Sequence, residues 1–228
     1  MLTLGIDTTA TAASCALVQD GEILGELNIR IGLQHSRTLM PMIQSLFNCC
    51  NISFDQVDRL AVTVGPGSFT GVRIGVSAIK GLAFTKELPC VGLSTLEALA
   101  GNIPPTDALI CPVMDARCNQ VYNALFAYEN GKIQRLCEDR AITIDQLQKE
   151  LSLQEKPVIW LGDGSLLCYN ALENKENHQL APEHLRYQKA AQVALLGEKA
   201  TQTVSSFSLE ISYLRPPQAV RARMEQNK

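Results

Sequence analysis

The sequence predicts an α/β fold made of two halves that repeat the order β-β-β-α-β-α. Apolar strand-like runs alternate with segments of helical spacing, and an Asp-Gly or Asn-Gly turn precedes the third strand of each half. A turn-rich joint at residues 101–106, with a glycine, an asparagine and two prolines, separates the halves. We therefore expect domains at residues 1–103 and 104–228, and the 228-residue chain is long enough for both.

The first half opens with three strands, the last two joined at Asp20-Gly21, and continues as helix, strand, helix and strand. These elements are expected at residues 2–7, 14–18, 23–31, 38–50, 60–64, 70–85 and 90–93. If Thr38 is the N-cap of the first helix, Pro41 falls in the first turn, where its missing N–H has no partner to lose; an earlier start would kink the helix. Ser94 and Glu97 form a capping-box signature, which predicts another helix start.

The second half repeats this order from residue 108, with a turn at Asn130-Gly131 before its third strand. Strands are expected at residues 108–115, at 121–128, from 132 and at 158–161, and helices at 144–151, 166–174 and 190–203. We assign the tail to the second domain and leave open the alternative that it packs against the first domain.

Composition excludes several classes of protein. The net charge is −3 and the isoelectric point is near 5.7, so the chain lacks the overall basic field that grips phosphate backbones. The eight cysteines include no C-x-x-C pair, no leader-like segment precedes them, and no apolar run reaches about 20 residues. We expect reduced thiols, a cytoplasmic location and no membrane contact. The tail holds Arg215, Arg221, Arg223 and Lys228, for which we favour solvated surface over direct contact with RNA.

The glycine-rich run at residues 65–75 is the most informative motif. It follows a buried strand and opens a helix, so Gly65 and Gly67 are expected in a tight turn. Gly71, Gly75 and Ala78 remove bulk from one face of that helix, which predicts close approach by another helix. Packing within the subunit and a phosphate cradle are the alternatives, although the run lacks both the Walker and the dinucleotide patterns.

Three loops fall at matching places in the two halves: Asp7-Thr8-Thr9, Asp115-Ala116-Arg117 and Gly162-Asp163-Gly164. In duplicated folds of this kind such loops can direct N–H groups and a carboxylate at phosphates and magnesium. Taken singly, each is more simply interpreted as an ordinary strand end or turn.

Six ordered segments together resemble the TsaB (YeaZ) family of bacterial tRNA threonylcarbamoyladenosine proteins. They are residues 5–9, 34–43, 65–83, 94–100, 115–117 and 213–216. The resemblance implies an actin-like, two-domain fold related to sugar kinases and to the catalytic subunit TsaD. TsaD-like proteins bind metal through an H-x-x-x-H pair, but the corresponding residues 78–86 contain no histidine, and His35, His178 and His184 are not at metal-ligand spacing. We expect no metal site and no catalytic residue.

The resemblance implies a non-catalytic subunit that binds TsaD directly. The complex adds threonylcarbamoyl to N6 of adenosine 37 in tRNAs reading A-starting codons, with TsaE and TsaC completing the pathway and tRNA bound through the complex. The isolated chain is expected as a homodimer that requires no cofactor, with ATP or ADP and Mg acting in the complex. The nucleotide-contacting residues would be Asp7, Thr8, Thr9, Asp115, Gly162 and Gly164.

The partner interface is expected on the helices at 38–50 and 70–85, as one half of a four-helix bundle. Apolar residues of the first helix cover more of its circumference than one buried stripe needs. The expected interface residues are Leu39, Met42, Ile43, Leu46, Phe47, Gly71, Ile74, Gly75 and Ala78. Gly75→Trp is accordingly predicted to block assembly while leaving the fold intact. His35, at the entry to the first helix, is expected to cap it, contact a partner or face water.

Two other functions remain as alternatives. A small-molecule kinase would use Asp7 and Asp115 around magnesium ATP, but the chain is short and offers no residue placed as a general base. A metallopeptidase would require an H-x-x-x-H or H-E-x-x-H motif, and the sequence contains neither.

Overall fold

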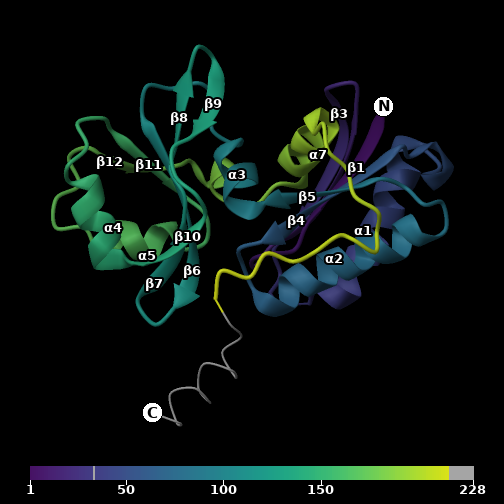
Figure 1. Ribbon diagram of the computed structural model, residues 1–228, viewed down its shortest axis with the longest axis horizontal. Coiled ribbons are helices and arrows are strands. Elements are labelled where there is room, and N and C mark those ends of the chain that lie inside the picture. The colour runs from purple at the N-terminus through teal and green to yellow at the C-terminus, as the bar shows by residue number, and fades with distance from the viewer. Residues whose placement is uncertain (33, 216–228) are drawn as a thin grey trace, which may run out of the picture.

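The computed structural model describes residues 1–32 and 34–215, arranged as two lobes side by side (Figure 1). Arg221, Arg223 and Lys228 of the basic tail, and Pro216 of the last family segment, lie outside the described residues. Each lobe is built on one sheet. The strand order is β3-β2-β1-β4-β5 in the first and β10-β7-β6-β11-β12 in the second, with β8 and β9 attached beside β6. Since the two orders correspond strand by strand, the duplicated α/β fold is confirmed.

The first sheet closely follows the prediction. Its strands are β1 (Leu2–Asp7), β2 (Ala13–Gln19), β3 (Glu22–Ile29), β4 (Arg59–Gly65) and β5 (Cys90–Ser94). Helices α1 (His35–Cys50) and α2 (Phe69–Phe84) cover one face, and α7 (Ala190–Lys199) covers the other (Figure 1). Every residue of β1 is buried because helices cover both faces of the sheet.

Helix α7 packs on the first sheet although it lies late in the chain. A Cβ at Gly5 would stand 2.6 Å from the Ala190 carbonyl oxygen, so glycine there permits the close approach. The following segment stays with the same lobe: Val204 pairs with Cys90, and the Ser212 N–H donates to the Val64 carbonyl oxygen at 2.9 Å. Residues 190–215 therefore belong spatially to the first lobe, whereas their position in the chain suggested the second.

The start of α1 differs from the prediction. The helix begins at His35, and the Gln34 side chain makes no cap hydrogen bond. Thr38 lies inside the helix, its hydroxyl donating to the Gln34 carbonyl oxygen at 3.2 Å, and Pro41 is therefore internal. Thr38 as N-cap was wrong because His35 anchors the first turn: its Nε2 lies 2.7 Å from the Ala10 carbonyl oxygen in a buried contact. His35 is buried and therefore does not face water, and it lies at one end of the groove between α1 and α2.

The second lobe contains the strands β6 (Leu109–Arg117), β7 (Gln120–Asn123), β8 (Phe126–Glu129), β9 (Lys132–Arg135), β10 (Arg140–Thr143), β11 (Val158–Leu161) and β12 (His178–Leu180). Its helices are α4 (Ile144–Leu151), α5 (Ser165–Asn170) and α6 (Glu183–Arg186), and helix α3 (Thr95–Ala100) packs against β6. The short 3₁₀ turn η1 (Phe54–Gln56) precedes β4 in the first lobe.

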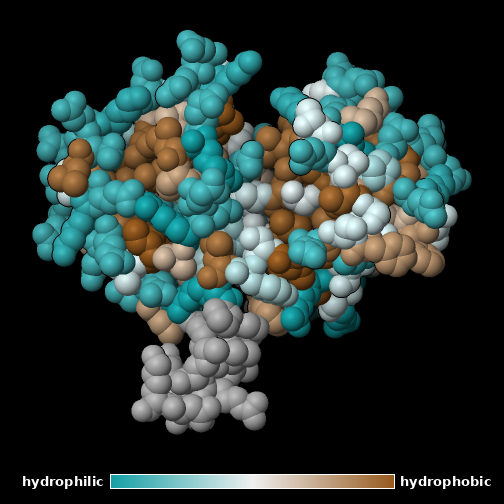
Figure 2. All heavy atoms as spheres, in the orientation of Figure 1, coloured by the Kyte–Doolittle hydropathy of each residue, from teal (hydrophilic) through white to brown (hydrophobic). Residues whose placement is uncertain are grey.

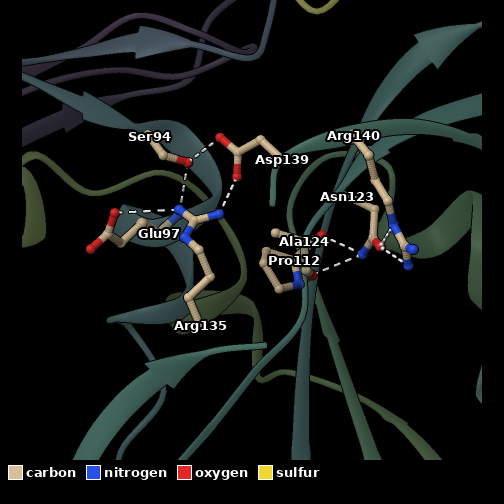
Figure 3. Close-up of polar contacts among 8 residues, drawn as sticks. All are labelled: Ser94, Glu97, Pro112, Asn123, Ala124, Arg135, Asp139 and Arg140. Atoms are coloured by element: carbon tan, nitrogen blue, oxygen red, sulfur yellow. Dashed lines mark hydrogen bonds and ion pairs between the residues drawn. The ribbon is translucent and has the colours of Figure 1, made fainter. Parts of the chain in front are cut away.

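The single strand expected at 121–128 is two strands. The chain leaves the sheet after Asn123, whose buried amide donates to the carbonyl oxygens of Pro112 at 3.2 Å and Ala124 at 2.9 Å (Figure 3). Arg140 donates to the Asn123 Oδ1 at 3.1 Å and so brings in β10, a strand that the sequence did not predict (Figure 3).

A polar cluster fastens the end of β5 to the second lobe. Ser94 caps α3 as predicted, accepting from the Glu97 N–H at 3.3 Å, but the Glu97 side chain pairs with Arg135 at 3.3 Å rather than closing a capping box. Asp139 accepts from both Ser94 and Arg135 (Figure 3). The side chains of this cluster are only partly exposed. Their contacts hold the segment that connects the two lobes, residues 94–97, against the second lobe. In the described part of the chain, no helix is long and apolar enough to span a membrane.

Candidate functional site

The expected interface residues of α1 lie inside the subunit. Leu39, Met42, Ile43, Leu46 and Phe47 are all buried in the first lobe's core, together with residues of β1, β2 and β4. These apolar side chains therefore fill a deep core against the buried sheet, and Leu39 also lines the groove between α1 and α2.

Gly71 and Gly75 also point inward. A Cβ at Gly71 would overlap the Thr8 carbonyl oxygen, and one at Gly75 would lie 2.6 Å from the Thr8 Oγ1 and 3.4 Å from Val62. These glycines let α2 approach the end of β1, so the packing alternative within the subunit explains them. The expectation that Gly75→Trp leaves the fold intact was wrong for the same reason.

Ile74 and Ala78 are the members of the expected set that reach the surface of α2. They line a groove of about 560 Å³ between α1 and α2, together with Met40, Arg73 and Ser77. Met40 is 48% exposed, and Phe84 at the end of α2 is 65% exposed. Figure 2 shows apolar residues reaching the surface of this lobe, over α2 and the C-terminal segment.

Gly81 lies further along this outer side of α2. A Cβ there would meet nothing within 4 Å, in contrast to Gly71 and Gly75. Glycine in a helix interior costs about 1 kcal/mol relative to alanine, and packing inside this subunit gives no reason for it. The sequence showed the glycines of α2 but not which side each one occupies, so Met40, Ser77, Gly81 and Phe84 were missed.

The side chains of Asp7, Thr8 and Thr9, at the end of β1, make hydrogen bonds within the subunit. The Asp7 Oδ1 accepts from both the N–H and the hydroxyl of Thr9 at 2.8 Å, while the Thr8 hydroxyl donates to the Gly71 carbonyl oxygen at 2.7 Å. All three side chains are buried. Burial raises the pKa of Asp7, and the hydrogen bonds from Thr9 only partly offset this. The Asp7 Oδ2 is buried without a hydrogen-bond partner.

A cleft of about 290 Å³ lies between the lobes. It brings together Thr9–Thr11, the glycine-rich turn at 66–70, the hairpin at 115–117, Asp163 and residues 212–215. The loops identified in the sequence therefore do meet at one place, although Asp7 and Thr8 do not line it. The C-terminal wall was not anticipated.

The acidic side of the cleft comes from the second lobe. The Asp115 Oδ1 accepts from the Arg117 N–H at 2.8 Å, and its Oδ2 pairs with the Arg117 guanidinium at 3.1 Å. Arg117, Cys118 and Asn119 have φ values of 65°, 54° and 55°, so this hairpin turn is tightly constrained. Asp163 accepts from the Asp115 N–H at 3.3 Å, and burial together with the Asp115 charge raises the pKa of Asp163 to about 6. The sequence motif contains Asp163 but did not predict it as a site residue.

Gly162 and Gly164 are explained by packing. Gly162 has φ +95°, and a Cβ there would overlap the Val113 carbonyl oxygen; a Cβ at Gly164 would lie 3.0 Å from the Asp115 nitrogen. Both glycines let the loop after β11 lie against β6. By doing so they place Asp163 at the cleft, so their contribution to the site is to position Asp163.

These residues do not fit a magnesium–phosphate site in the form the sequence suggested. The Thr8 and Thr9 hydroxyls already donate within the subunit, and Arg117 engages both oxygens of Asp115. Within residues 1–32 and 34–215, no three His, Cys, Asp or Glu side chains gather as a metal-binding group. These side chains therefore provide no chemical step through a metal or a nucleotide.

Asp163 should make stability depend on pH. Because its folded pKa of about 6 exceeds the ordinary value of 3.8, its protonation stabilises the fold fully below about pH 4, and that contribution is lost as the pH rises through 6. Asp163→Asn should remove roughly 1–3 kcal/mol of this pH-dependent change. Urea unfolding at pH 4, 5, 6 and 7 in chelator measures it.

The matched control is Asp107→Asn at an exposed position in the joint, which should leave the profile unchanged. Parallel stability profiles for the wild type and Asp163→Asn would show that the Asp163 carboxyl is not held in its protonated form.

Comparison with known proteins identifies the family. Residues 31–218 match the family model described as TsaD: tRNA N6-adenosine threonylcarbamoyltransferase. The "tRNA threonylcarbamoyladenosine biosynthesis protein TsaB" of Bacillus subtilis is 32% identical over 232 aligned residues, covering 100% of both chains. The protein of the same name from Escherichia coli is 32% identical over 167 residues, covering 72% of this chain and 71% of the relative.

A solved structure agrees on the fold. The structure titled "YeaZ from Pseudomonas aeruginosa" superimposes with a TM-score of 0.79 at 23% identity, covering 93% of this chain and 99% of that one. The full-length match in sequence and the match in fold cover both lobes, including the α1–α2 face and the inter-lobe cleft. The chain therefore belongs to the TsaB (YeaZ) family of tRNA threonylcarbamoyladenosine biosynthesis proteins.

Proposed function

We propose that this chain acts in tRNA threonylcarbamoyladenosine biosynthesis as a non-catalytic subunit that binds and orders TsaD. The observation that carries the proposal is the outer side of α2. There Ile74, Ser77, Ala78 and Gly81 recur at helical spacing beside a groove, and a Cβ added at Gly81 would meet nothing within 4 Å. Small residues on one side of a helix, here Ser77, Ala78 and Gly81, suit close approach of a second helix.

The kinship between the two proteins supports TsaD as the occupant. The "tRNA N6-adenosine threonylcarbamoyltransferase" of Thermosipho africanus is 30% identical to this chain over 109 residues, covering 41% of this chain and 33% of that protein. A related fold can present an equivalent helix pair, so a homodimer and a heterodimer can use the same surface in turn. We accordingly propose a homodimer for the isolated chain and its replacement by TsaD in the complex.

The state of the inter-lobe cleft supports a subunit without chemistry of its own. The Thr9 hydroxyl and the Asp115 carboxylate, both at the cleft, are engaged inside the chain, and the pKa of Asp163 is raised. The kinase alternative needs these groups free to hold magnesium ATP. We propose that the isolated chain requires no cofactor, that ATP or ADP with Mg acts in the complex, and that TsaE, TsaC and tRNA join through it.

Co-purification with TsaD of the same species tests the proposal. We expect affinity-tagged TsaD to retain this chain through gel filtration, and sedimentation of mixtures to show the homodimer decreasing as the heterodimer forms. Failure of TsaD to bind at micromolar concentrations of both proteins, under conditions in which both are folded, would contradict the proposal.

A further inference from the structure

The segment Leu209–Arg215, here called the strap, is seated on the first lobe by backbone contacts. Leu209 is buried in the core, and Ser212 donates to the Val64 carbonyl oxygen at 2.9 Å. Gly65 has φ +120°, and a Cβ there would lie 2.6 Å from the Ser212 carbonyl oxygen. The glycine that opens the glycine-rich run is therefore required by the strap as well as by the turn.

The other end of the strap reaches the second lobe. The Arg215 guanidinium donates to the Ala116 carbonyl oxygen at 3.0 Å, and Ala116 is the penultimate residue of β6, just before the constrained hairpin. Between its two ends, the strap lines the inter-lobe cleft opposite Thr9–Thr11. Since the strap contacts both lobes across the cleft, the cleft cannot widen without breaking one of these contacts.

The middle of the strap is attached to α2. The Tyr213 ring centroid lies 5.2 Å from that of Phe69, and the Arg73 guanidinium carbon lies 3.7 Å over the Phe69 ring. The Arg73 Nε donates to the Tyr213 hydroxyl at 2.9 Å. Phe69 and Arg73 also line the α1–α2 groove, so one cluster forms part of both the groove and the wall of the cleft.

We propose that the strap couples the α1–α2 groove to the inter-lobe cleft, so that a partner seated on α2 fixes Arg73, holds Tyr213 and closes the cleft through Arg215. This coupling rests on the proposed function for its partner, but the closure of the cleft by the strap does not. A coupling of this kind requires a contiguous element that both sites contact, and the strap with Phe69 and Arg73 is such an element.

Amide hydrogen exchange at residues 67–70 and 115–118 tests closure in the isolated chain. Arg215→Ala and Tyr213→Ala should each speed exchange in both loops about fivefold, the factor expected for one lost hydrogen bond, while β1 stays protected. Tyr169→Ala on α5 (Ser165–Asn170) is the matched control for the lost ring and should leave both loops unchanged. Wild-type exchange rates in both strap variants would overturn the proposal.

Adding TsaD tests the coupling. Exchange in both loops of the wild type should slow further, by about fivefold, whereas the loops of Tyr213→Ala should not respond even though TsaD is still captured. An equal response in Tyr213→Ala and the wild type would overturn the coupling. If TsaD does not bind the wild type, the proposed function fails, and the comparison of isolated chains still decides whether the strap closes the cleft.

Discussion

Gly71→Ala is expected to destabilise the chain by about 3 kcal/mol, because the added methyl group would overlap the Thr8 carbonyl oxygen. A backbone carbonyl at the end of a buried strand cannot move aside as a flexible side chain can. Urea unfolding measures the change. The larger Gly75→Trp should prevent folding altogether, since even a Cβ at Gly75 would lie 2.6 Å from the Thr8 hydroxyl.

Gly81→Ala is the matched control in the same helix. A Cβ at that position meets nothing within 4 Å, so the substitution should stabilise the isolated chain by up to about 1 kcal/mol through helix propensity. Equal effects of the two substitutions would contradict the assignment of an inner and an outer side to α2.

Ala78→Glu is expected to weaken capture of TsaD by about 100-fold or more, without unfolding the chain. Ala78 is half-buried and lines the α1–α2 groove, where a partner helix would bury and desolvate the new carboxylate. Ser77→Arg, at an exposed position in the same groove, should act in the same direction with less effect on folding. Titrations of tagged TsaD against each variant give the affinities.

Ala141→Glu controls for the added charge, because Ala141 is an exposed alanine on β10 in the other lobe. Its affinity for TsaD should match that of the wild type. If Ala78→Glu and Ser77→Arg both fold and bind TsaD normally, the outer side of α2 is not the interface.

The sequence predicted the fold well because its signals are local. Apolar runs, the Asp20-Gly21 turn and the Ser94 cap identify elements from their own residues, and repetition of their order identifies the duplication. The errors arose where contacts between residues far apart in the sequence determine the local structure. The His35 contact with Ala10 moved the start of α1, and Asn123 with Arg140 divided one strand into two.

The candidate site was predicted less completely for a similar reason. Helical spacing shows that Gly71, Gly75 and Ala78 are close to one another, but it does not show that the end of β1 lies against the first two. Likewise, a motif such as Asp7-Thr8-Thr9 does not reveal that its hydroxyls are used internally. The strap was not predictable from local pattern, because its seat at Gly65 and its contact at Ala116 are far away in the chain.

Reconstituted tRNA modification tests the central claim most directly, namely that this chain is a TsaD-binding subunit without its own chemistry. Purified TsaC, TsaD, TsaE and unmodified tRNA are incubated with this chain, without it, or with Ala78→Glu, and threonylcarbamoyladenosine and ATP consumption are measured. The account predicts product only with the wild-type chain and TsaD together, and no ATP turnover by the chain alone. Rapid turnover by the isolated chain that is abolished by Asp7→Ala, or full product formation in its absence, would contradict the account.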